Sequence, residues 1–395
     1  MISPEDRFWI VAEAVRGNAH RGYVIDWDQR RWYMVCGPKS LMPPEEEKEI
    51  GILQHYIDRL PENVHTINVD NDGALLSTNT EDDPTLIPYY PRYSDTPSLH
   101  ECPTIRISQL TELDRLGPGV DLMSYVEDAA SRKVVFKYSI IVQWMQQIWK
   151  EMHLVKSFRH PNLVPFDHVV VEDTDSRVLG FTTTYIPGGT LDQNRHRIFR
   201  FGWLQQLTSV IDYLNLDLGI VHQDVAPRNL LIDPTTDKLQ LFDFDRSAPI
   251  GQVVSSRNDV TGVVFTLYEI ITEDTHFRDI PFTEQDPHQV LSLEKWPVRC
   301  KLDRDVAQFR AHLNDWVKRR TGGRHVPDQA KGPSTPNMPP PSPMLECHSG
   351  TGEPIYVTGL PRTRSEALKQ KKNVIIWERP PQQQSDCRCE DAFET

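Results

Sequence analysis

The stretch "IVHQDVAPRNLLID" at residues 220–233 carries the strongest pattern in the chain. His222, Asp224 and Asn229 stand in it as H-x-D-x-x-x-x-N, an apolar strand-like run follows, and Asp243 comes fourteen residues after Asn229. In phosphoryl transfer, one carboxylate positions the attacking hydroxyl and accepts its proton, while an amide and a second carboxylate hold Mg²⁺. The residue types in this stretch therefore favour phosphoryl-transfer chemistry.

With this loop, the chain resembles the eukaryotic protein kinase family, and other motifs of that family occur in order. Lys137, in "VVFK", stands like the strand lysine that contacts the α- and β-phosphates. Glu151 lies nine residues before "HPN" (160–162), where the helix partner of that lysine is found. Asp259 stands at the start of a helix that resembles the buried central helix of the large lobe. The resemblance covers roughly residues 104–325.

The resemblance implies a role for each matching residue, with ATP and Mg²⁺ as cofactors. Asp224 is expected to be the base, with Arg228 supplying positive charge to the transferred phosphoryl group or, alternatively, pairing with a surface carboxylate. His222 is expected to be structural. Mg²⁺ ligands are expected at Asn229 and Asp243. Contacts with the nucleotide are expected from Lys137, Glu151, Gly117, Gly119, Thr184 and Ile186, with Thr183 near the gatekeeper position.

Several residues depart from the family pattern. Leu122 stands where a third glycine of the phosphate-binding loop would be, which suggests a looser or partly blocked lid. Gln223 replaces the arginine that commonly precedes the catalytic aspartate, so activation by loop phosphorylation is not expected. The metal motif reads Asp243-Phe244-Asp245 instead of Asp-Phe-Gly. Aspartate tolerates unusual backbone angles, so we expect the turn to form and Asp243 to bind metal.

The segment between Asp243 and Asp259 is short. Its fifteen residues span at most about 50 Å when fully extended. This is too little for the platform on which protein kinases present a substrate peptide. The shortening resembles small-molecule kinases of the choline and aminoglycoside phosphotransferase type.

The pattern of elements predicts an α+β, two-lobed protein kinase-like fold, with a small β-rich lobe and a larger helical lobe. Strands are expected at 134–140 and, as a hairpin, at 166–186, and helices at 141–158, 203–216 and 260–272. The domains are expected at 1–98 (an extension of unknown role), 99–325 (kinase-like), 326–345 (proline-rich linker) and 346–395 (a tail). Within them, we expect a helical start, a strand at 30–37, a linker at 79–98 and a strand-helix-strand order at 354–382.

Composition and charge restrict the cellular compartment and the binding partners that can be expected. The net charge of −13 argues against nucleic acid or an anionic membrane as the main partner. Six scattered cysteines without a C-x-x-C pair favour free thiols in a reducing compartment. With no signal peptide or apolar span apparent, the expected location is the cytoplasm or nucleus, and not the secreted space.

Three functions remain open on the sequence. The first is an ATP- and Mg²⁺-dependent phosphotransferase that acts on a protein hydroxyl. The second is a kinase whose substrate is a small-molecule alcohol, which the short segment favours. The third is a pseudokinase that binds partners or nucleotide without turnover. Leu122, Asp245 and the short segment favour it, and the five polar catalytic residues oppose it.

Overall fold

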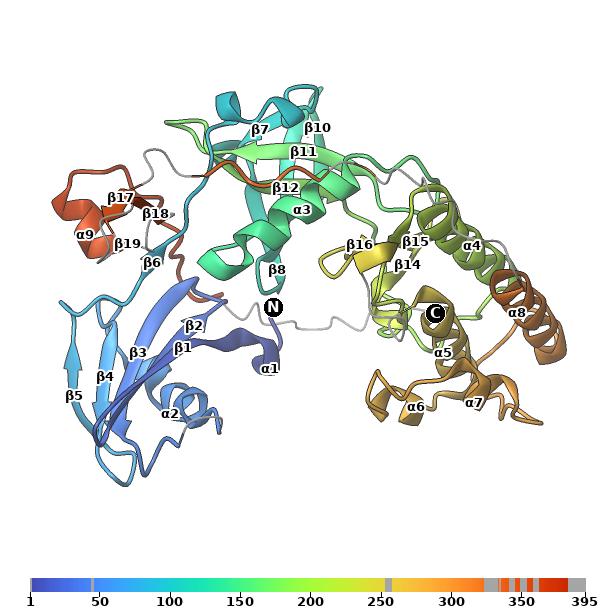
Figure 1. Ribbon diagram of the computed structural model, residues 1–395, viewed down its shortest axis with the longest axis horizontal. Coiled ribbons are helices and arrows are strands. Elements are labelled where there is room, and N and C mark those ends of the chain that lie inside the picture. The colour runs from blue at the N-terminus through green and yellow to red at the C-terminus, as the bar shows by residue number, and fades with distance from the viewer. Residues whose placement is uncertain are drawn as a thin grey trace, which may run out of the picture.

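Three bodies follow one another across the molecule in Figure 1: an N-terminal sheet, a second sheet carrying one helix, and a helical lobe. The computed structural model describes residues 2–43, 46–252, 258–322, 333, 335–340, 345–348, 354–357 and 362–382. Within these residues, no helix combines the length and the apolar character needed to cross a membrane.

The N-terminal residues fold into a five-stranded sheet. Its strands, in spatial order, are β1 (Phe8–Arg16), β2 (Ala19–Asp26), β3 (Arg31–Pro38), β4 (Thr66–Val69) and β5 (Leu75–Asn79). Within this sheet, β3 and β4 pair in parallel and the other neighbouring strands pair antiparallel. Helix α2 (Lys48–Tyr56) covers one face, where its Leu53 packs with Val24, Val35 and Ile67 in a separate core. The extension is therefore a folded domain.

The expected helical start is wrong beyond its first turn. Helix α1 contains only Pro4–Arg7, and the chain then enters β1, as the edge strand of the sheet. Three β-branched residues lie in this stretch (Ile10, Val11 and Val15), and β1 pairs with β2 along nearly its whole length. Cross-strand pairing thus outweighs the local helical pattern. The expected strand at 30–37 is confirmed as β3.

The small lobe of the kinase-like domain is a six-stranded sheet. Its spatial order is β7 (Thr104–Arg106), β11 (Phe166–Val171), β12 (Val178–Thr184), β10 (Ala130–Tyr138), β9 (Val120–Glu127) and β8 (Thr111–Gly117). Helix α3 (Met145–Val155) lies against the sheet (Figure 1). The expected strands and this helix are confirmed. Because β10 lies between β9 and β12, Lys137 sits on an interior strand.

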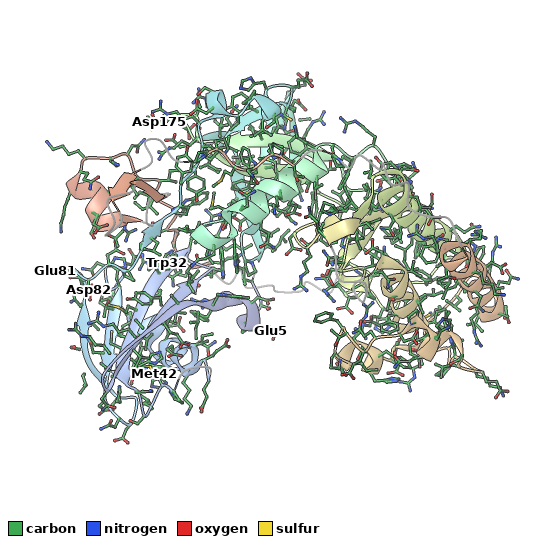
Figure 2. The ribbon with its side chains drawn as sticks, in the orientation of Figure 1. Glu5, Trp32, Met42, Glu81, Asp82 and Asp175 are labelled. Atoms are coloured by element: carbon green, nitrogen blue, oxygen red, sulfur yellow. The ribbon has the colours of Figure 1, made fainter. Side chains whose placement is uncertain are left out.

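The core of the small lobe continues into the N-terminal domain. One cluster joins Phe136 and Met123 of the small lobe to Trp27 and Trp32 of the N-terminal residues. Trp32 lies where the two sheets approach each other in Figure 2. The expected linker at 79–98 crosses this junction and is packed: the buried Tyr90 donates its hydroxyl to the Ser139 carbonyl at 2.7 Å. The two sheets therefore share buried apolar surface.

The large lobe is built around α5 (Asp259–Thr272), a mostly buried helix. The other helices are α4 (Phe201–Asp212), α6 (His276–Asp279), α7 (Pro287–Leu291) and α8 (Val306–Thr321). Short strand pairs join β14 (Leu230–Asp233) to β15 (Lys238–Leu241) and β13 (Ile220–Val221) to β16 (Ala248–Pro249). The expected helices in this lobe are confirmed, and the β14–β15 hairpin positions the loop before it.

The C-terminal tail returns to the small lobe. It contains β17 (Leu345–His348), β18 (Pro354–Val357), β19 (Arg362–Thr363) and α9 (Arg364–Lys369), and β19 pairs with β6 (Leu86–Ile87). The expected final strand is wrong: residues 373–382 are not in a strand. Instead, Trp377 stacks on Tyr138 with ring centroids 5.0 Å apart, and Arg379 binds Asp121 at 3.0 Å. Tertiary contacts, not sheet pairing, fix this end of the tail.

The described part of the proline-rich stretch also has contacts, which a free spacer would lack. Trp149 of α3 donates its indole N–H to the Pro336 carbonyl at 2.8 Å. Gln146, also on α3, accepts the backbone N–H of Met338 at 3.3 Å. These residues lie along the helix that carries Glu151.

Candidate active site

Lys137 forms the centre of a buried ion cluster between the two lobes. Its ammonium lies 2.6 Å from Oε1 of Glu151 on α3 and 2.7 Å from Oδ1 of Asp243. Burial alone would lower the pKa of Lys137, but the charges of Asp243 and Glu151 outweigh it and raise that pKa. Lys137 is therefore held in its charged form, which a phosphate-binding lysine requires.

The charge of Lys137 favours the ionised form of both partners, but the net pKa shifts of the two carboxylates differ. Burial raises the pKa of Glu151, and the nearby lysine only partly offsets this. Burial also tends to raise the pKa of Asp243, but the charge of Lys137 outweighs burial there and lowers that pKa. Glu151 also accepts the backbone N–H of Phe244 at 3.1 Å. The glutamate thus positions both the lysine and the segment that carries Asp243.

Asp224 lies at the start of the loop that precedes β14. The amide nitrogen of Asn229 donates to the Asp224 carboxylate at 3.0 Å and to its carbonyl at 2.8 Å. Arg228 pairs with the other carboxylate oxygen of Asp224. The alternative expected for Arg228 was a surface carboxylate, but its partner is Asp224, the expected base, whose side chain is only 14% exposed.

The buried Asp259 fixes the backbone ahead of this loop. Its carboxylate accepts the backbone N–H groups of His222 and Gln223, both at 2.9 Å. The ring of His222 donates from Nε2 to the Phe242 carbonyl at 3.0 Å, which ties the loop to the strand before Asp243. The structural role expected for His222 agrees with these contacts. Gln223 has a φ of 66° and donates its side-chain amide to the Arg246 carbonyl at 2.6 Å.

The unusual backbone angle of the metal motif belongs to Asp243 and not to Asp245. Asp243 has a φ of 68°, whereas Asp245 is absent from the residues with positive φ among those described. The glycine replaced by Asp245 is therefore not needed here for a left-handed turn. Phe244 is buried against Phe158 and the His222 ring, with centroids 4.6 and 4.8 Å apart. This packing holds the motif in place.

Asp245 points to α3. Its Oδ2 accepts the side-chain amide of Gln147 at 2.9 Å. Burial, followed by the charge of Asp243, raises the pKa of Asp245. Asp245 is not among the residues that line the cavity described next.

A cavity of about 440 Å³ opens beside the ion cluster, a volume in the range of small-molecule sites. Six expected residues line it: Gly117, Lys137, Glu151, Thr184, Ile186 and Asp243. So does Thr183. Tyr185, between Thr184 and Ile186, also lines it. Sequence reasoning missed the remaining lining residues: Leu116, Val120, Val135, Val155, Val164, Gly189, Thr190, Gln193, Leu231, Phe242 and Phe244. Leu116, Phe242 and Phe244 lie directly beside a motif residue, but an apolar side chain alone does not distinguish a cavity wall from a core.

The turn between β8 and β9 differs from the expected phosphate lid. Gly117 lines the cavity, but Gly119 does not. With φ at 67°, Gly119 packs so closely on β10 that a Cβ atom would lie 2.4 Å from the Tyr138 carbonyl oxygen. Leu122 lies inside β9, is buried, and is not part of the cavity wall. The expected partial blockage by Leu122 is therefore not found.

The donor set near Asp243 fits Mg²⁺, which prefers oxygen ligands. Asn229 directs its amide nitrogen at Asp224, which leaves its amide oxygen for a metal. One oxygen of Asp243 binds Lys137, which leaves the other. The Phe242 N–H donates to the Asn229 carbonyl at 3.2 Å, so the two expected ligands come from adjacent segments.

A β-rich lobe with a buried lysine–glutamate pair, set above a helical lobe that holds this loop, defines a protein kinase-like domain. Residues 123–293 match the protein kinase domain family. The chain contains a domain of the eukaryotic protein kinase-like family. This match includes Lys137, Glu151, Asp224, Asn229 and Asp243, but leaves the N-terminal sheet and the tail outside.

Individual relatives match parts of the same type of protein. The chain is 33% identical over 115 residues to "CBL-interacting serine/threonine-protein kinase 5" of Arabidopsis thaliana, covering 28% of this chain and 25% of that protein. It is 33% identical over 125 residues to "CBL-interacting protein kinase 28" of Oryza sativa subsp. japonica, covering 29% and 27%. The chain thus spans about a quarter of the length of these curated relatives.

Proposed function

We propose that the protein is a phosphotransferase that uses ATP and Mg²⁺ to phosphorylate a hydroxyl group of a protein. The observation that carries this proposal is the ion cluster of Lys137, Glu151 and Asp243 at the cavity, with Asp224 and Asn229 on the adjacent loop. A scaffold has no physical need for all five polar groups in these contacts. Their arrangement favours turnover over the pseudokinase alternative.

In this proposal, the adenine base lies beside Thr184 and Ile186, and Lys137 binds the phosphates. Mg²⁺ at Asn229 and Asp243 would neutralise the charge that develops on the leaving phosphate. Asp224 orients the substrate hydroxyl and takes its proton. The hydroxyl oxygen then forms a bond to the γ-phosphorus as the bond to the β-phosphate oxygen breaks, and ADP leaves. Arg228, already paired with Asp224, would contribute positive charge near the transferred group.

A small-molecule alcohol is the second candidate substrate, and the segment after Asp243 favours it. This segment returns at once to the large lobe: β16 pairs with β13, and the Ile250 N–H donates to the Gly219 carbonyl at 2.9 Å. Its first part is therefore used in the lobe's own contacts, which leaves little chain for a peptide platform. The two relatives are named as protein kinases, one of them as a serine/threonine-protein kinase, and these names support the protein hydroxyl instead.

The test is transfer of label from γ-labelled ATP, with Mg²⁺, to a protein extract and separately to a metabolite pool. We expect labelled protein from the parent and none from Asp224→Asn. Asp237→Asn, which changes a half-exposed carboxylate of the same lobe, serves as the control and should keep full transfer. Label only in the metabolite pool would favour the second candidate. No label in either, together with no Mg²⁺-dependent thermal shift by ATP, would refute the phosphotransferase.

We also infer that the protein acts inside the cell, in the cytoplasm or nucleus. Cys36, Cys102 and Cys300 are free thiols, which a reducing compartment maintains. Fractionation of the producing cells tests this inference, and recovery of the protein mainly from the medium would contradict it.

A further inference from the structure

Three side chains that could bind a metal ion meet in the N-terminal domain, far in sequence from the kinase motifs. They are Glu13 of β1, His20 of β2 and Glu49 of α2, and one potential ligand atom from each lies within 4.8 Å of the others. Nε2 of His20 is 2.7 Å from Oε1 of Glu49 and 4.0 Å from Oε2 of Glu13. The side chains of His20 and Glu49 are 0% and 1% exposed, while that of Glu13 is 26% exposed. The cluster is therefore buried, with one ligand at its rim.

The local sequence builds this cluster on one face of the sheet. Glu13 is paired directly with Gly22, and His20 lies two residues before Gly22 on the same strand. Residues opposite each other, and residues two apart, share a face of a sheet. A Cβ atom at position 22 would lie 2.4 Å from Cγ of Glu49. Glycine at this position thus makes room for the Glu49 side chain to cross β2 and reach His20.

The buried atoms of the cluster lack hydrogen bonds. Both ring nitrogens of His20 and both carboxylate oxygens of Glu49 are buried, and none makes a hydrogen bond to the described part of the chain. The short contact of His20 with Glu49 has the distance of a hydrogen bond but not its direction. A buried carboxylate without a hydrogen bond is costly unless a cation compensates its charge. A simple histidine–glutamate hydrogen bond therefore does not account for the arrangement.

We propose that Glu13, His20 and Glu49 bind a divalent transition-metal ion, with Zn²⁺ as the ion of choice. One imidazole and two carboxylates suit zinc, whereas Mg²⁺ and Ca²⁺ prefer oxygen ligands alone. Around a tetrahedral zinc, ligand atoms lie about 3.3–3.6 Å apart, between the 2.7 and 4.0 Å found here, so small side-chain rotations complete the site. A water molecule completes the coordination from the side of Glu13. The ion ties the edge strand β1 and helix α2 to β2.

The experiment uses the full-length protein, stripped of metal with a chelator and dialysed. Zinc affinity is measured by competition with a chromophoric chelator in excess Mg²⁺, which saturates the kinase site. We expect one zinc per chain above any background, and at least about a tenfold loss of affinity in Glu13→Gln and Glu49→Gln. Glu46→Gln, which removes an exposed carboxylate just before α2, is the matched control and should bind zinc like the parent.

Glu13→Gln decides the matter if Glu49→Gln fails to fold, because Glu13 is at the rim and its replacement leaves the buried contact of His20 with Glu49 in place. Zinc should also raise the thermal midpoint of the parent and of Glu46→Gln, but raise that of Glu13→Gln less. Equal zinc affinity in the parent, Glu13→Gln and any folded Glu49→Gln overturns the proposal. So does a parent that retains no zinc. In either case, His20 and Glu49 are a buried ion pair only.

Discussion

Replacing Lys137 by methionine should destabilise the protein even without nucleotide. The lysine ammonium lies 2.6 Å from Glu151 and 2.7 Å from Asp243, and the Glu151 side chain is only 2% exposed. Breaking a buried ion pair by removing one partner costs about 3–5 kcal/mol, because a charge is left buried. Glu151 keeps the Phe244 N–H and can take up a proton, and Asp243 is one-third exposed, so we expect the lower end, about 3 kcal/mol.

The assay is urea unfolding of the full chain at neutral pH, followed by circular dichroism, for the parent and Lys137→Met. Lys133→Met is the matched control, since Lys133 is an exposed lysine on the same strand. The control should stay within about 0.5 kcal/mol of the parent. ATP with Mg²⁺ should stabilise the parent and the control but not Lys137→Met.

A double variant separates the two carboxylates. Replacing both partners of a buried pair by apolar residues is often neutral, so Lys137→Met with Glu151→Met should recover most of the lost stability without recovering the response to ATP. A loss below about 1 kcal/mol in Lys137→Met would refute the buried ion cluster. A double variant as unstable as Lys137→Met would show that the cost does not arise from Glu151.

Three further outcomes are expected. Asp243→Asn should abolish the Mg²⁺-dependent thermal shift by ATP, while Asp245→Gly should preserve or increase it, because Asp245 lies outside the cavity wall and its φ is not positive; a lost shift in Asp245→Gly would contradict this. Burial lowers the pKa of His153 to about 4, so the unfolded chain takes up a proton between pH 6.5 and 4 that the folded chain refuses. Stability should therefore fall as the pH drops through this window, by up to about 1.4 kcal/mol per pH unit, and less in His153→Gln, as urea unfolding at several pH values would show. Arg379→Gln should speed limited proteolysis within residues 373–382, because Arg379 binds Asp121 at 3.0 Å and the Asp28 carbonyl at 2.7 Å; unchanged cleavage would mean that these contacts do not hold the tail.

The residues that meet in the kinase-like site could be predicted because they occur in the order and at the spacing that the family shows. The loop from His222 to Asn229 is short enough for its own backbone to place Asp224 beside Asn229. Lys137 and Glu151 needed the resemblance, since their contact joins a strand to a helix fourteen residues away. The helical lobe followed from apolar periodicity, which long helices such as α5 display clearly.

Other features depend on contacts that no local pattern encodes. The stretch that begins at Phe8 became a strand because it pairs with β2, not because of its own preference. The left-handed backbone at Asp243 could not be predicted from the motif. The residue replaced in the motif is the glycine, so a positive φ would be expected at position 245 instead. Trp377 and Tyr138 stack across more than two hundred residues of sequence. In each case, the deciding interaction is tertiary.

Segments outside the residues that match the family contact α3 and the residue just before it, and α3 carries Glu151 of the site. Trp144, just before this helix, stacks on Trp27 of the N-terminal domain with centroids 5.7 Å apart and meets Trp9 edge-on at 5.2 Å. From the C-terminal side, the Pro336 carbonyl accepts the Trp149 N–H.

Protein kinases commonly set this helix through a phosphorylated loop, which pairs with an arginine at the position of Gln223. Here a glutamine occupies that position, and Gln223 instead bonds the Arg246 backbone. The pair of Lys137 and Glu151 nevertheless forms at 2.6 Å. The N-terminal tryptophans contact Trp144 just before α3, and the proline-rich segment contacts the helix itself, so segments outside the two lobes help to position α3.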